Sequence, residues 1–327
     1  MALLADVRRR VRAGAGRGHL RQVFTSELVG LAERDERIVL LTGDLGYTVL
    51  EPFTERFPNR FYNVGVAEQN MVGLATGLAE AGFVPFCYSI ATFGTLRPYE
   101  FIRNGPLAHD LPVRIVGVGG GFDYGENGLT HYALEDVAVM RVQPRMTVLT
   151  PADDDQAAAA VRATADIRGP AYLRVARAGP PVTGLQGRFR LGRAETIGAG
   201  SDVALVALGA AAAEAVEAAG MLESEGLSTT VAVISSFNPS PTDDLAELLA
   251  TTPLAVSVEA HYAVGGVGSF VAETIAEAGL DCRLVRCGVR TMPTGESGSR
   301  EYLQERHGLS PAAIARATLA AAARSAI

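Results

Sequence analysis

The sequence predicts an α/β protein in which a parallel-sheet domain is followed by a smaller α/β domain. Short β-branched runs alternate with alanine-rich segments of helical periodicity, which is typical of βαβ units around a parallel sheet. The alternation stops in the proline- and glycine-rich stretch AGPPVTGLQGRFRLGRAE and then starts again. A chain of 327 residues is also longer than one ordinary domain, so we expect two.

The first part of the chain contains five runs that we interpret as strands. In order, they are RIVLLTGD, RFYNVGVA, VPFCYSI, VRIVGVG and MTVLTP. Helical patterns lie near residues 21–34, 68–82 and 153–165. Within the segment 68–82, apolar side chains recur at helical spacing, and we expect this stripe to face the sheet. The stripe consists of Val72, Ala75, Leu78 and Ala79.

The second part repeats the pattern with the strands DVALVALG, TTVAVISS, LAVSVEAH and CRLVRCG, separated by helices. We therefore divide the chain into a leader at 1–18, a first domain at 19–178, a linker at 179–192 and a second domain at 193–327. In the leader, the charges come too early and the apolar run is too short for a secretion signal.

Composition excludes several classes of function. The net charge of −7 argues against a nucleic-acid or anionic-membrane surface, and no apolar run is long enough to span a membrane. The chain has no lysine, which excludes a Walker A loop and a pyridoxal phosphate Schiff base. Cys87, Cys282 and Cys287 form no CxxC pair, which favours a reducing cytoplasm.

The stretch GVAEQNMVG places a lone carboxylate, Glu68, where a strand ends and a helix begins. An acid in the first turn of a helix complements the helix dipole, and that role alone would explain it. The carboxyl edge of a parallel sheet is also where ligands bind, so Glu68 is a candidate for chemistry.

Two further motifs are ambiguous when each is taken alone. In YGENGLTHYALEDVA, a tight glycine-rich connection precedes His131, for which a turn or capping role is the alternative. In ATFGTLRPYEFIRN, Phe93, Tyr99 and Phe101 have a spacing that core aromatics also show.

Together and in order, these segments resemble the transketolase family. The run from RFYNVGVAEQN to RPYEFIRN, followed by VGVGGGFDYGENGLTHYALEDVAVMRVQPRMTVLTPAD, resembles the pyrimidine-binding domain of transketolases. The stretches VEAHYAVGGVGS and TGESGSREYLQERHGLSP resemble their C-terminal domain. The resemblance extends from about residue 19 to the end of the chain.

The resemblance implies that the cofactor is thiamine diphosphate. Glu68 matches the family's glutamate that shares a proton with N1′ of the aminopyrimidine and so activates the cofactor as an electron sink. Phe93 matches the aromatic residue that stacks on the aminopyrimidine, whereas Ile90 stands where a second phenylalanine is usual. Asp44, in TGDLG, and Val66 fall at positions close to the cofactor.

The resemblance also implies a set of substrate contacts. His131 matches the histidine that contacts the donor's oxygens, and Asn127 falls at a neighbouring donor-contacting acid, where an amide keeps hydrogen bonding but loses charge. Arg21 and Arg174 match arginines that bind the sugar phosphate. A phosphate-contacting histidine of many transketolases has no counterpart, because its place falls in Gly119–Gly121.

The GDG motif and downstream asparagine with which the family binds Mg²⁺ and the diphosphate have no counterpart in this chain, since TGDLG belongs to the pyrimidine-binding domain. The resemblance therefore implies the C-terminal subunit of a split transketolase. We expect the Mg²⁺ ligands on an N-terminal partner subunit, no metal ligands in this chain, and an α2β2 heterotetramer.

Several alternatives stay open. The donor would be a ketose phosphate, and the acceptor either an aldose phosphate or a specialised one such as a carrier-bound acyl group. The β subunit of a 2-oxoacid dehydrogenase shares this architecture, although GVAEQNMVG and GENGLTH favour transketolase. An inactive subunit that stabilises a partner is a third hypothesis, disfavoured by the joint presence of Glu68, Phe93 and His131. Deoxyxylulose phosphate synthases share the cofactor chemistry, but we expect their single chain to include the missing domain.

Overall fold

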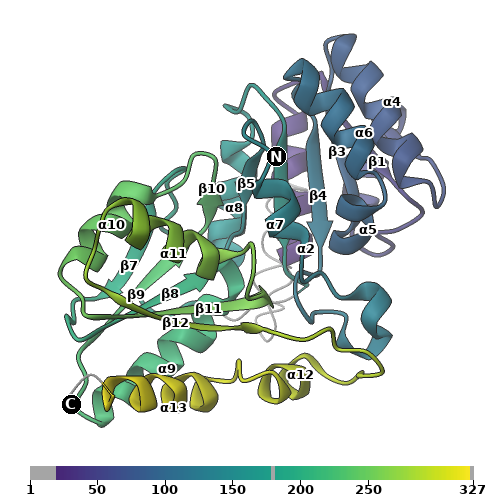
Figure 1. Ribbon diagram of the computed structural model, residues 1–327. Helices are drawn as coiled ribbons and strands as arrows, with labels where there is room; N and C mark the ends of the chain where they lie inside the picture. Colours follow the sequence, from purple (N-terminus) through teal and green to yellow (C-terminus); the bar gives the residue numbers. More distant parts are fainter. Residues whose placement is uncertain (1–19, 178–180, 325–327) are drawn as a thin grey trace.

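The computed structural model describes residues 20–177 and 181–324. The predicted leader, residue 19 and the start of the predicted linker lie outside these ranges. The described residues form two α/β units side by side, the first at the upper right of Figure 1 and the second at its lower left.

The first sheet has seven strands in the order β10-β5-β6-β4-β3-β1-β2. They are β1 (Ile38–Thr42), β2 (Phe61–Asn63), β3 (Val84–Ile90), β4 (Arg114–Val118), β5 (Thr147–Leu149), β6 (Ala171–Val175) and β10 (Ser236–Phe237). Neighbouring strands are parallel except for β10, which pairs antiparallel with β5. The five strands predicted in this part are confirmed. Strands β6 and β10 are additional to that prediction.

Helices cover both faces of this sheet. The α-helices are α2 (Leu20–Ala32), α3 (Glu51–Arg56), α4 (Glu68–Glu80), α5 (Ala91–Leu96), α6 (Tyr99–Ile102), α7 (Asp136–Arg141) and α8 (Asp154–Ala163). The connections contain the short 3₁₀ helices η1 (Pro58–Arg60), η3 (Gly125–Asn127) and η4 (Leu129–His131) and the π-helical segment η2 (Arg103–Leu107). Helices α2 and α8 pack on one face, while α4, α5 and α7 pack on the other. In α4, Val72, Ala75 and Ala79 are buried as predicted, and Leu78 is half-buried.

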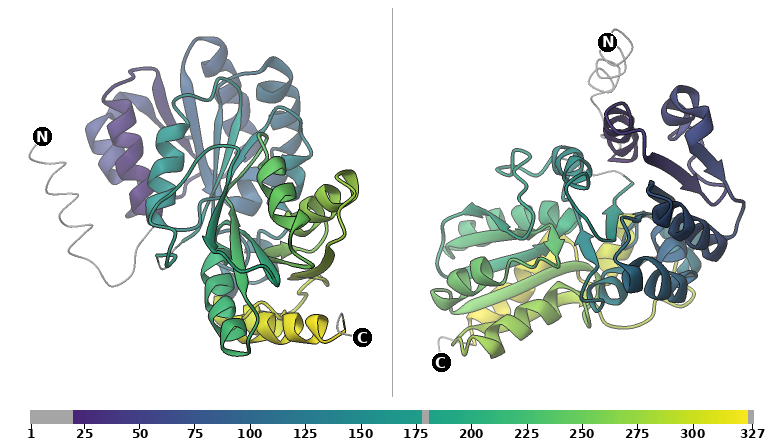
Figure 2. Two further views of the ribbon diagram at one scale, coloured as in Figure 1. Left: turned by 90° about the vertical axis from the view of Figure 1, so that its left-hand side faces the viewer. Right: turned by 90° about the horizontal axis from the view of Figure 1, so that it is seen from above.

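The second sheet has five strands in the order β12-β11-β8-β9-β7, of which β7 alone runs antiparallel to its neighbour. They are β7 (Ala194–Gly198), β8 (Val203–Leu208), β9 (Thr229–Ile234), β11 (Leu254–Tyr262) and β12 (Arg283–Val289). Its helices are η5 (Gly209–Ala211), α9 (Ala212–Ser224), α10 (Thr242–Ala250), α11 (Val267–Glu277), α12 (Arg300–Arg306) and α13 (Pro311–Ala322). Helices α9 and α13 lie on one face and α10 and α11 on the other (Figure 2). All four predicted strands are confirmed.

The two units share a core. Strand β10 follows β9 in the chain but belongs to the first sheet, where the Thr150 N–H donates to the Ser235 carbonyl at 2.8 Å. Phe237 in β10 packs edge-on against Phe270 of α11, with ring centroids 5.5 Å apart. One hydrophobic cluster runs from α4 and the first sheet through these two rings into α10 and α11. Separating the two units would therefore expose this shared core to solvent.

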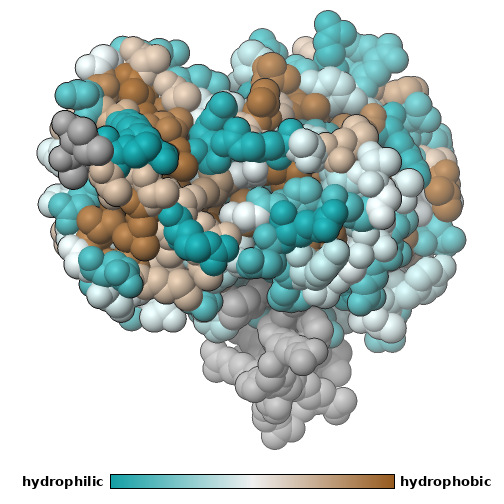
Figure 3. All heavy atoms as spheres, turned by 60° about the horizontal axis from the view of Figure 1, so that its bottom comes forward, coloured by the Kyte–Doolittle hydropathy of each residue, from teal (hydrophilic) through white to brown (hydrophobic). Residues whose placement is uncertain are grey.

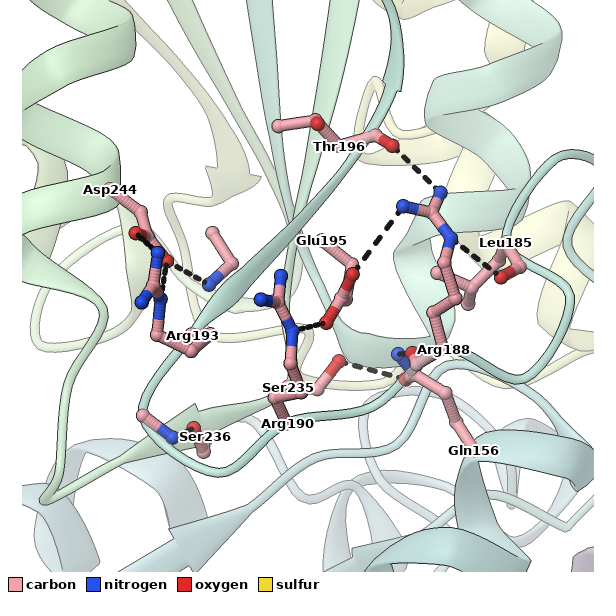
Figure 4. A network of polar contacts seen from close by, with 12 residues as sticks. Gln156, Leu185, Arg188, Arg190, Arg193, Glu195, Thr196, Ser235, Ser236 and Asp244 are labelled. Atoms are coloured by element: carbon pink, nitrogen blue, oxygen red, sulfur yellow. Dashed lines mark hydrogen bonds and ion pairs between the residues drawn. The ribbon is translucent and has the colours of Figure 1, made fainter.

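Ion pairs hold the described part of the segment that connects the units, residues 181–193 (Figure 4). Arg188 and Arg190 converge on the buried Glu195 carboxylate, at 3.4 and 2.9 Å. Arg193 pairs with Asp244 at the start of α10 at 2.6 Å. The Gln156 amide of α8 donates to the Arg188 carbonyl at 2.7 Å. The connection is thus tied to both units.

No helix among the described residues is long and apolar enough to cross a membrane. On the face of the molecule shown in Figure 3, apolar and polar residues are interspersed in small patches. Cys87, Cys282 and Cys287 are buried free thiols. Burial raises the pKa of each of these thiols.

Candidate active site

The carboxyl ends of four neighbouring parallel strands bring most of the predicted site residues to one edge of the first sheet. Because β2, β1, β3 and β4 lie next to one another and run in the same direction, the loops that follow them meet at this edge. Asp44 follows β1, Val66 and Glu68 follow β2, Ile90 ends β3 just before Phe93, and Asn127 and His131 follow β4.

Glu68 is the first residue of α4, and only 3% of its surface is exposed. One carboxylate oxygen, Oε1, accepts a hydrogen bond from the Ser89 hydroxyl at 3.3 Å. The backbone of Gly43 approaches the same oxygen so closely that an added Cβ there would lie 3.6 Å from it. The other oxygen, Oε2, lies 3.0 Å from Nη1 of Arg97. Glu68 is thus a buried acid with one oxygen held by the sheet and the other by an arginine.

Phe93 lies in α5 and contacts two other side chains of the site. The Arg97 guanidinium stacks over the Phe93 ring at 3.9 Å from its centroid, within the range of a cation–π contact. The His131 ring approaches the same phenylalanine nearly edge-on, with centroids 5.1 Å apart. Phe93 and Arg97 are four residues apart at the end of α5, so they share one side of that helix turn.

His131 ends the short turn η4, and its position is set by the preceding glycine connection. Gly128 has a φ of 80°, a left-handed conformation that glycine adopts without strain. The Thr130 hydroxyl lies 2.9 Å from Nδ1 of His131, and the Tyr124 ring lies 6.1 Å from the imidazole. Burial and, to a smaller extent, the Arg97 charge lower the pKa of His131. The neutral ring is therefore favoured.

Asp44 lies in the loop after β1 with a φ of 60°. Its carboxylate accepts hydrogen bonds from the Asn63 amide and the Tyr47 hydroxyl, each at 2.9 Å, and these bonds lower the pKa of Asp44. The side-chain oxygen of Asn63, Oδ1, in turn accepts hydrogen bonds from the backbone N–H groups of Asp44 and Gly65. This network joins the loop after β1 to the loop between β2 and Glu68.

The remaining cofactor and donor candidates differ in exposure. Ile90 is 8% exposed and packs at the end of β3, whereas Val66 is 73% exposed in the loop before α4. Asn127 is exposed on η3. Val66 and Asn127 are thus open to a ligand or to another chain, while Ile90 contributes mainly its apolar surface.

Arg21 and Arg174, both predicted to bind phosphate, lie in different environments. Burial raises the pKa of Tyr124. Arg21, in the first turn of α2, partly offsets this rise through its charge and a hydrogen bond to Tyr124. Tyr124 is the neighbour of His131, so Arg21 belongs to the border of the same site.

Arg174, in β6, is 9% exposed and engaged inside the protein. Its Nε lies 2.9 Å from the Asp136 carboxylate, and its Nη2 donates to the carbonyls of Ala133 and Ala260 at 2.8 and 3.0 Å. Tyr172 donates to the same Asp136 oxygen at 2.6 Å. Its Nε and Nη2 are thus held by protein atoms, while Arg174 also lines a cavity with Gly120 and Asp123.

Sequence reasoning missed Arg97, which contacts both Glu68 and Phe93. The spacing of four residues from Phe93 was a usable signal, because it places both side chains on one side of a helical turn. The contact with Glu68 joins residues 29 positions apart and has no local signature. Within residues 20–177 and 181–324, no three His, Cys, Asp or Glu side chains lie together as a metal site requires.

Comparison with known proteins identifies the two units. Residues 19–181 match the family model described as the pyrimidine-binding domain of transketolase, and residues 192–314 match that of the transketolase C-terminal domain. A solved structure described as a split gene transketolase in an inactive beta4 tetramer aligns with a TM-score of 0.85 and 37% identity, over 93% of this chain and 98% of that one.

Two relatives are subunits of similar length. The 6-deoxy-6-sulfo-D-fructose transketolase subunit SqwH of a Clostridium species is 35% identical over 300 residues, covering 91% of this chain and 92% of the relative. A subunit of the apulose-4-phosphate transketolase of Phocaeicola vulgatus is 34% identical over 268 residues, covering 81% of this chain and 86% of the relative. The fold, the two matched domains and these relatives agree, and the chain belongs to the transketolase family, of which it contains the pyrimidine-binding and C-terminal domains.

Proposed function

We propose that this chain is the pyrimidine-binding subunit of a two-chain, thiamine-diphosphate-dependent transketolase that transfers a two-carbon ketol unit from a ketose phosphate to an aldose or a specialised acceptor. The observation that carries the proposal is that the buried Glu68 carboxylate and the Phe93 ring, at the carboxyl edge of the sheet, both contact Arg97. Family membership supports the transferase class, and the position of these side chains supports the mechanism.

The residues present fit an aminopyrimidine ring. That ring is flat and needs an aromatic face together with a carboxylate for its N1′ nitrogen. In this chain one planar, nitrogen-rich group, the Arg97 guanidinium, meets both the Phe93 ring and the Glu68 carboxylate. A second planar, nitrogen-rich group would find the same two partners. When bound, thiamine diphosphate would supply the carbanion and electron sink for cleavage and formation of the ketol bond.

The chain's own residues would then hold and move protons around that ring. Glu68 would hold or share the proton of N1′, and its burial keeps water from competing for it. His131, as a neutral ring beside Phe93, would accept a hydrogen bond from a donor hydroxyl or donate one to its carbonyl oxygen. Asp44, Ile90 and Val66 would border the cofactor, and Asn127 would contact the donor.

Arg21 is the candidate that we favour for the anionic end of the sugar. Its charge and a hydrogen bond act on Tyr124, whose ring lies 6.1 Å from the His131 imidazole, and a guanidinium suits an anionic oxygen group such as phosphate. Arg174, which lines a cavity with Gly120 and Asp123, stays a proposal for the same role. The name of the Clostridium relative specifies a sulfo sugar and that of the Phocaeicola relative a sugar phosphate; both are anionic sugars, which supports an anionic donor such as the proposed ketose phosphate.

We further propose that the chain acts only with an N-terminal subunit that supplies the Mg²⁺ ligands and binds the diphosphate, in an α2β2 assembly. The names of the subunit-length relatives support this division of labour. The matches at 19–181 and 192–314 support a first domain at 19–178, a linker at 179–192 and a second domain at 193–327. A cytoplasmic location also belongs to the proposal, because the three cysteines are buried free thiols.

The test is a substitution at Glu68 in the complex reconstituted with the partner subunit, thiamine diphosphate and Mg²⁺. We expect Glu68→Gln and Glu68→Ala to lower ketose turnover by about 10²- to 10⁴-fold, the usual contribution of a positioned proton-transfer group. The matched control is Glu80→Gln, which changes an exposed acid at the other end of the same helix. Unchanged turnover in both Glu68 variants would refute the mechanism.

The same complex distinguishes the alternatives. Release of CO₂ from pyruvate without ketose turnover would identify the β subunit of a 2-oxoacid dehydrogenase. Absence of both reactions in a complex that binds thiamine diphosphate would favour an inactive, partner-stabilising subunit. A carrier-bound acyl acceptor would be recognised by ketol transfer that requires the carrier protein.

A further inference from the structure

Arg97 makes two contacts that an aminopyrimidine would also need. Its Nη1 lies 3.0 Å from Glu68 Oε2, and its guanidinium carbon lies 3.9 Å above the Phe93 ring centroid. The Glu68 side chain is 2% exposed, whereas that of Arg97 is 45% exposed. A buried acid is therefore paired with a side chain that has room to move.

The two groups compete for the same surfaces. Oε1 of Glu68 is already bordered by the Ser89 hydroxyl and the Gly43 backbone, so Oε2 is the oxygen that Arg97 takes. The Phe93 face that could stack on a flat ring carries the guanidinium. A guanidinium and a protonated aminopyrimidine are both planar N–H donors with delocalised charge. The carboxylate edge and the ring face cannot hold both at once.

We propose that Arg97 is a built-in competitor of the cofactor, which pairs with Glu68 and covers Phe93 until the aminopyrimidine of thiamine diphosphate displaces it. This inference rests on the proposed function. The displacement requires only side-chain rotation, because Arg97 follows the last residue of α5 and its side chain reaches the site from the exposed side.

The competition has an effect on affinity. Before the cofactor arrives, Arg97 keeps the buried Glu68 charge paired, which avoids an isolated buried carboxylate. After it arrives, that pair and the stacking contact are both lost. The measured affinity for thiamine diphosphate is therefore lower than that of a site without the arginine. The apparent dissociation constant equals the intrinsic one divided by the fraction of molecules whose site is not covered by Arg97.

The experiment measures the dissociation constant of thiamine diphosphate by calorimetry, with Mg²⁺, in the reconstituted two-chain complex. We expect Arg97→Met to tighten binding by about tenfold, since it removes an ion pair and a cation–π contact from the free state. Arg97→Lys, which keeps the charge but not the planar stack, should lie between Arg97→Met and wild type. The matched control is Arg103→Met, which changes an exposed arginine further along the chain that contacts Asn104.

An Arg97→Met complex that binds the cofactor as weakly as wild type, or more weakly, would overturn the proposal. A structure of the wild-type complex with thiamine diphosphate gives a second test that needs no variant. There we expect the Arg97 guanidinium to have left Oε2 of Glu68, and a persisting 3.0 Å pair beside the bound ring would contradict the proposal. A wild-type complex that binds no thiamine diphosphate would instead refute the proposed function.

Discussion

The imidazole of His131 meets the ring of Phe93 nearly edge-on, 5.1 Å between centroids, and thereby joins the loop after β4 to helix α5. Both rings border the Glu68–Arg97 pair, because Arg97 stacks on the same phenylalanine. The protonation of His131 therefore responds to the charge of Arg97.

We expect the pKa of His131 to lie below the ordinary value of 6.5, because burial and then the Arg97 charge disfavour the imidazolium. Arg97→Met should raise the pKa of His131, since one of the two causes is removed. The measurement is an NMR titration of the imidazole C–H signals, assigned with His131→Gln. If activity requires the neutral ring, turnover should be constant through pH 6.5 and fall only at more acidic pH. A His131 that titrates at or above 6.5 would contradict this.

Breaking the buried pair of Arg174 and Asp136 should destabilise the protein strongly. Arg174→Met leaves the Asp136 carboxylate, which is 1% exposed, without its cation, and such losses cost about 3–5 kcal/mol. Urea denaturation of the free chain measures the effect. The matched control is Arg162→Met, which removes a half-exposed pair with Glu27 and should cost less than about 1 kcal/mol. Equal losses in the two variants would count against a structural role for Arg174.

The buried residues Glu259 and His261 should give opposing pH dependences of stability. Burial raises the pKa of Glu259 to about 7 and lowers that of His261 to about 4. As pH rises from about 4.5, the folded state keeps a proton on Glu259 that the unfolded chain releases, so this residue's contribution to stability falls. His261 acts in the opposite sense, because between about pH 4 and 6.5 only the unfolded chain binds its proton.

We therefore expect His261→Gln to remove the opposing contribution, so that the pH dependence of stability caused by Glu259 can be measured. In that variant the urea midpoint should fall as pH rises from 4.5 to 7, more steeply than in wild type. Midpoints measured at half-unit intervals would show it. A variant whose midpoint is flat or rises across this window would rule out the protonated Glu259 on which the expectation depends.

Asn63→Ala should weaken cofactor binding without unfolding the chain. The Asn63 side chain donates to Asp44 at 2.9 Å and accepts from the N–H groups of Asp44 and Gly65, all at the exposed edge of the sheet. Its loss should raise the pKa of Asp44 towards the ordinary value and loosen the loops around Glu68. We expect a thiamine diphosphate dissociation constant several-fold higher and an unchanged circular dichroism spectrum. An unaltered dissociation constant would remove Asp44 from the cofactor site.

The fold was predictable wherever periodicity was long enough to read. Strand β3 begins and ends where VPFCYSI does, and α4 begins at Glu68 as expected. Strand β10 has only two residues and therefore no period, and its place in the first sheet depends on pairing with β5. Strand β6 (AYLRV) was not predicted, although its apolar run is similar to those of β4 and β12, which also contain arginine.

The same reasoning applies to the site. The motifs around Glu68, Phe93 and His131 identify these residues in the sequence, and the structure brings them together. The burial of Arg174 could not be read from the chain, because its partner Asp136 lies on another element. The contact between Arg97 and Glu68 is equally tertiary.

The placement of β10 has a consequence for synthesis on the ribosome. Strand β5 ends at Leu149, and the strand that will protect its edge begins only at Ser236. At about 5–20 residues per second, the nascent chain carries this bare edge for roughly 4–17 s. An unpaired strand edge is a template for association with other chains. A fragment ending in the 179–192 segment would keep the edge bare permanently, so we expect the first matched domain to associate with other chains when it is made without the second.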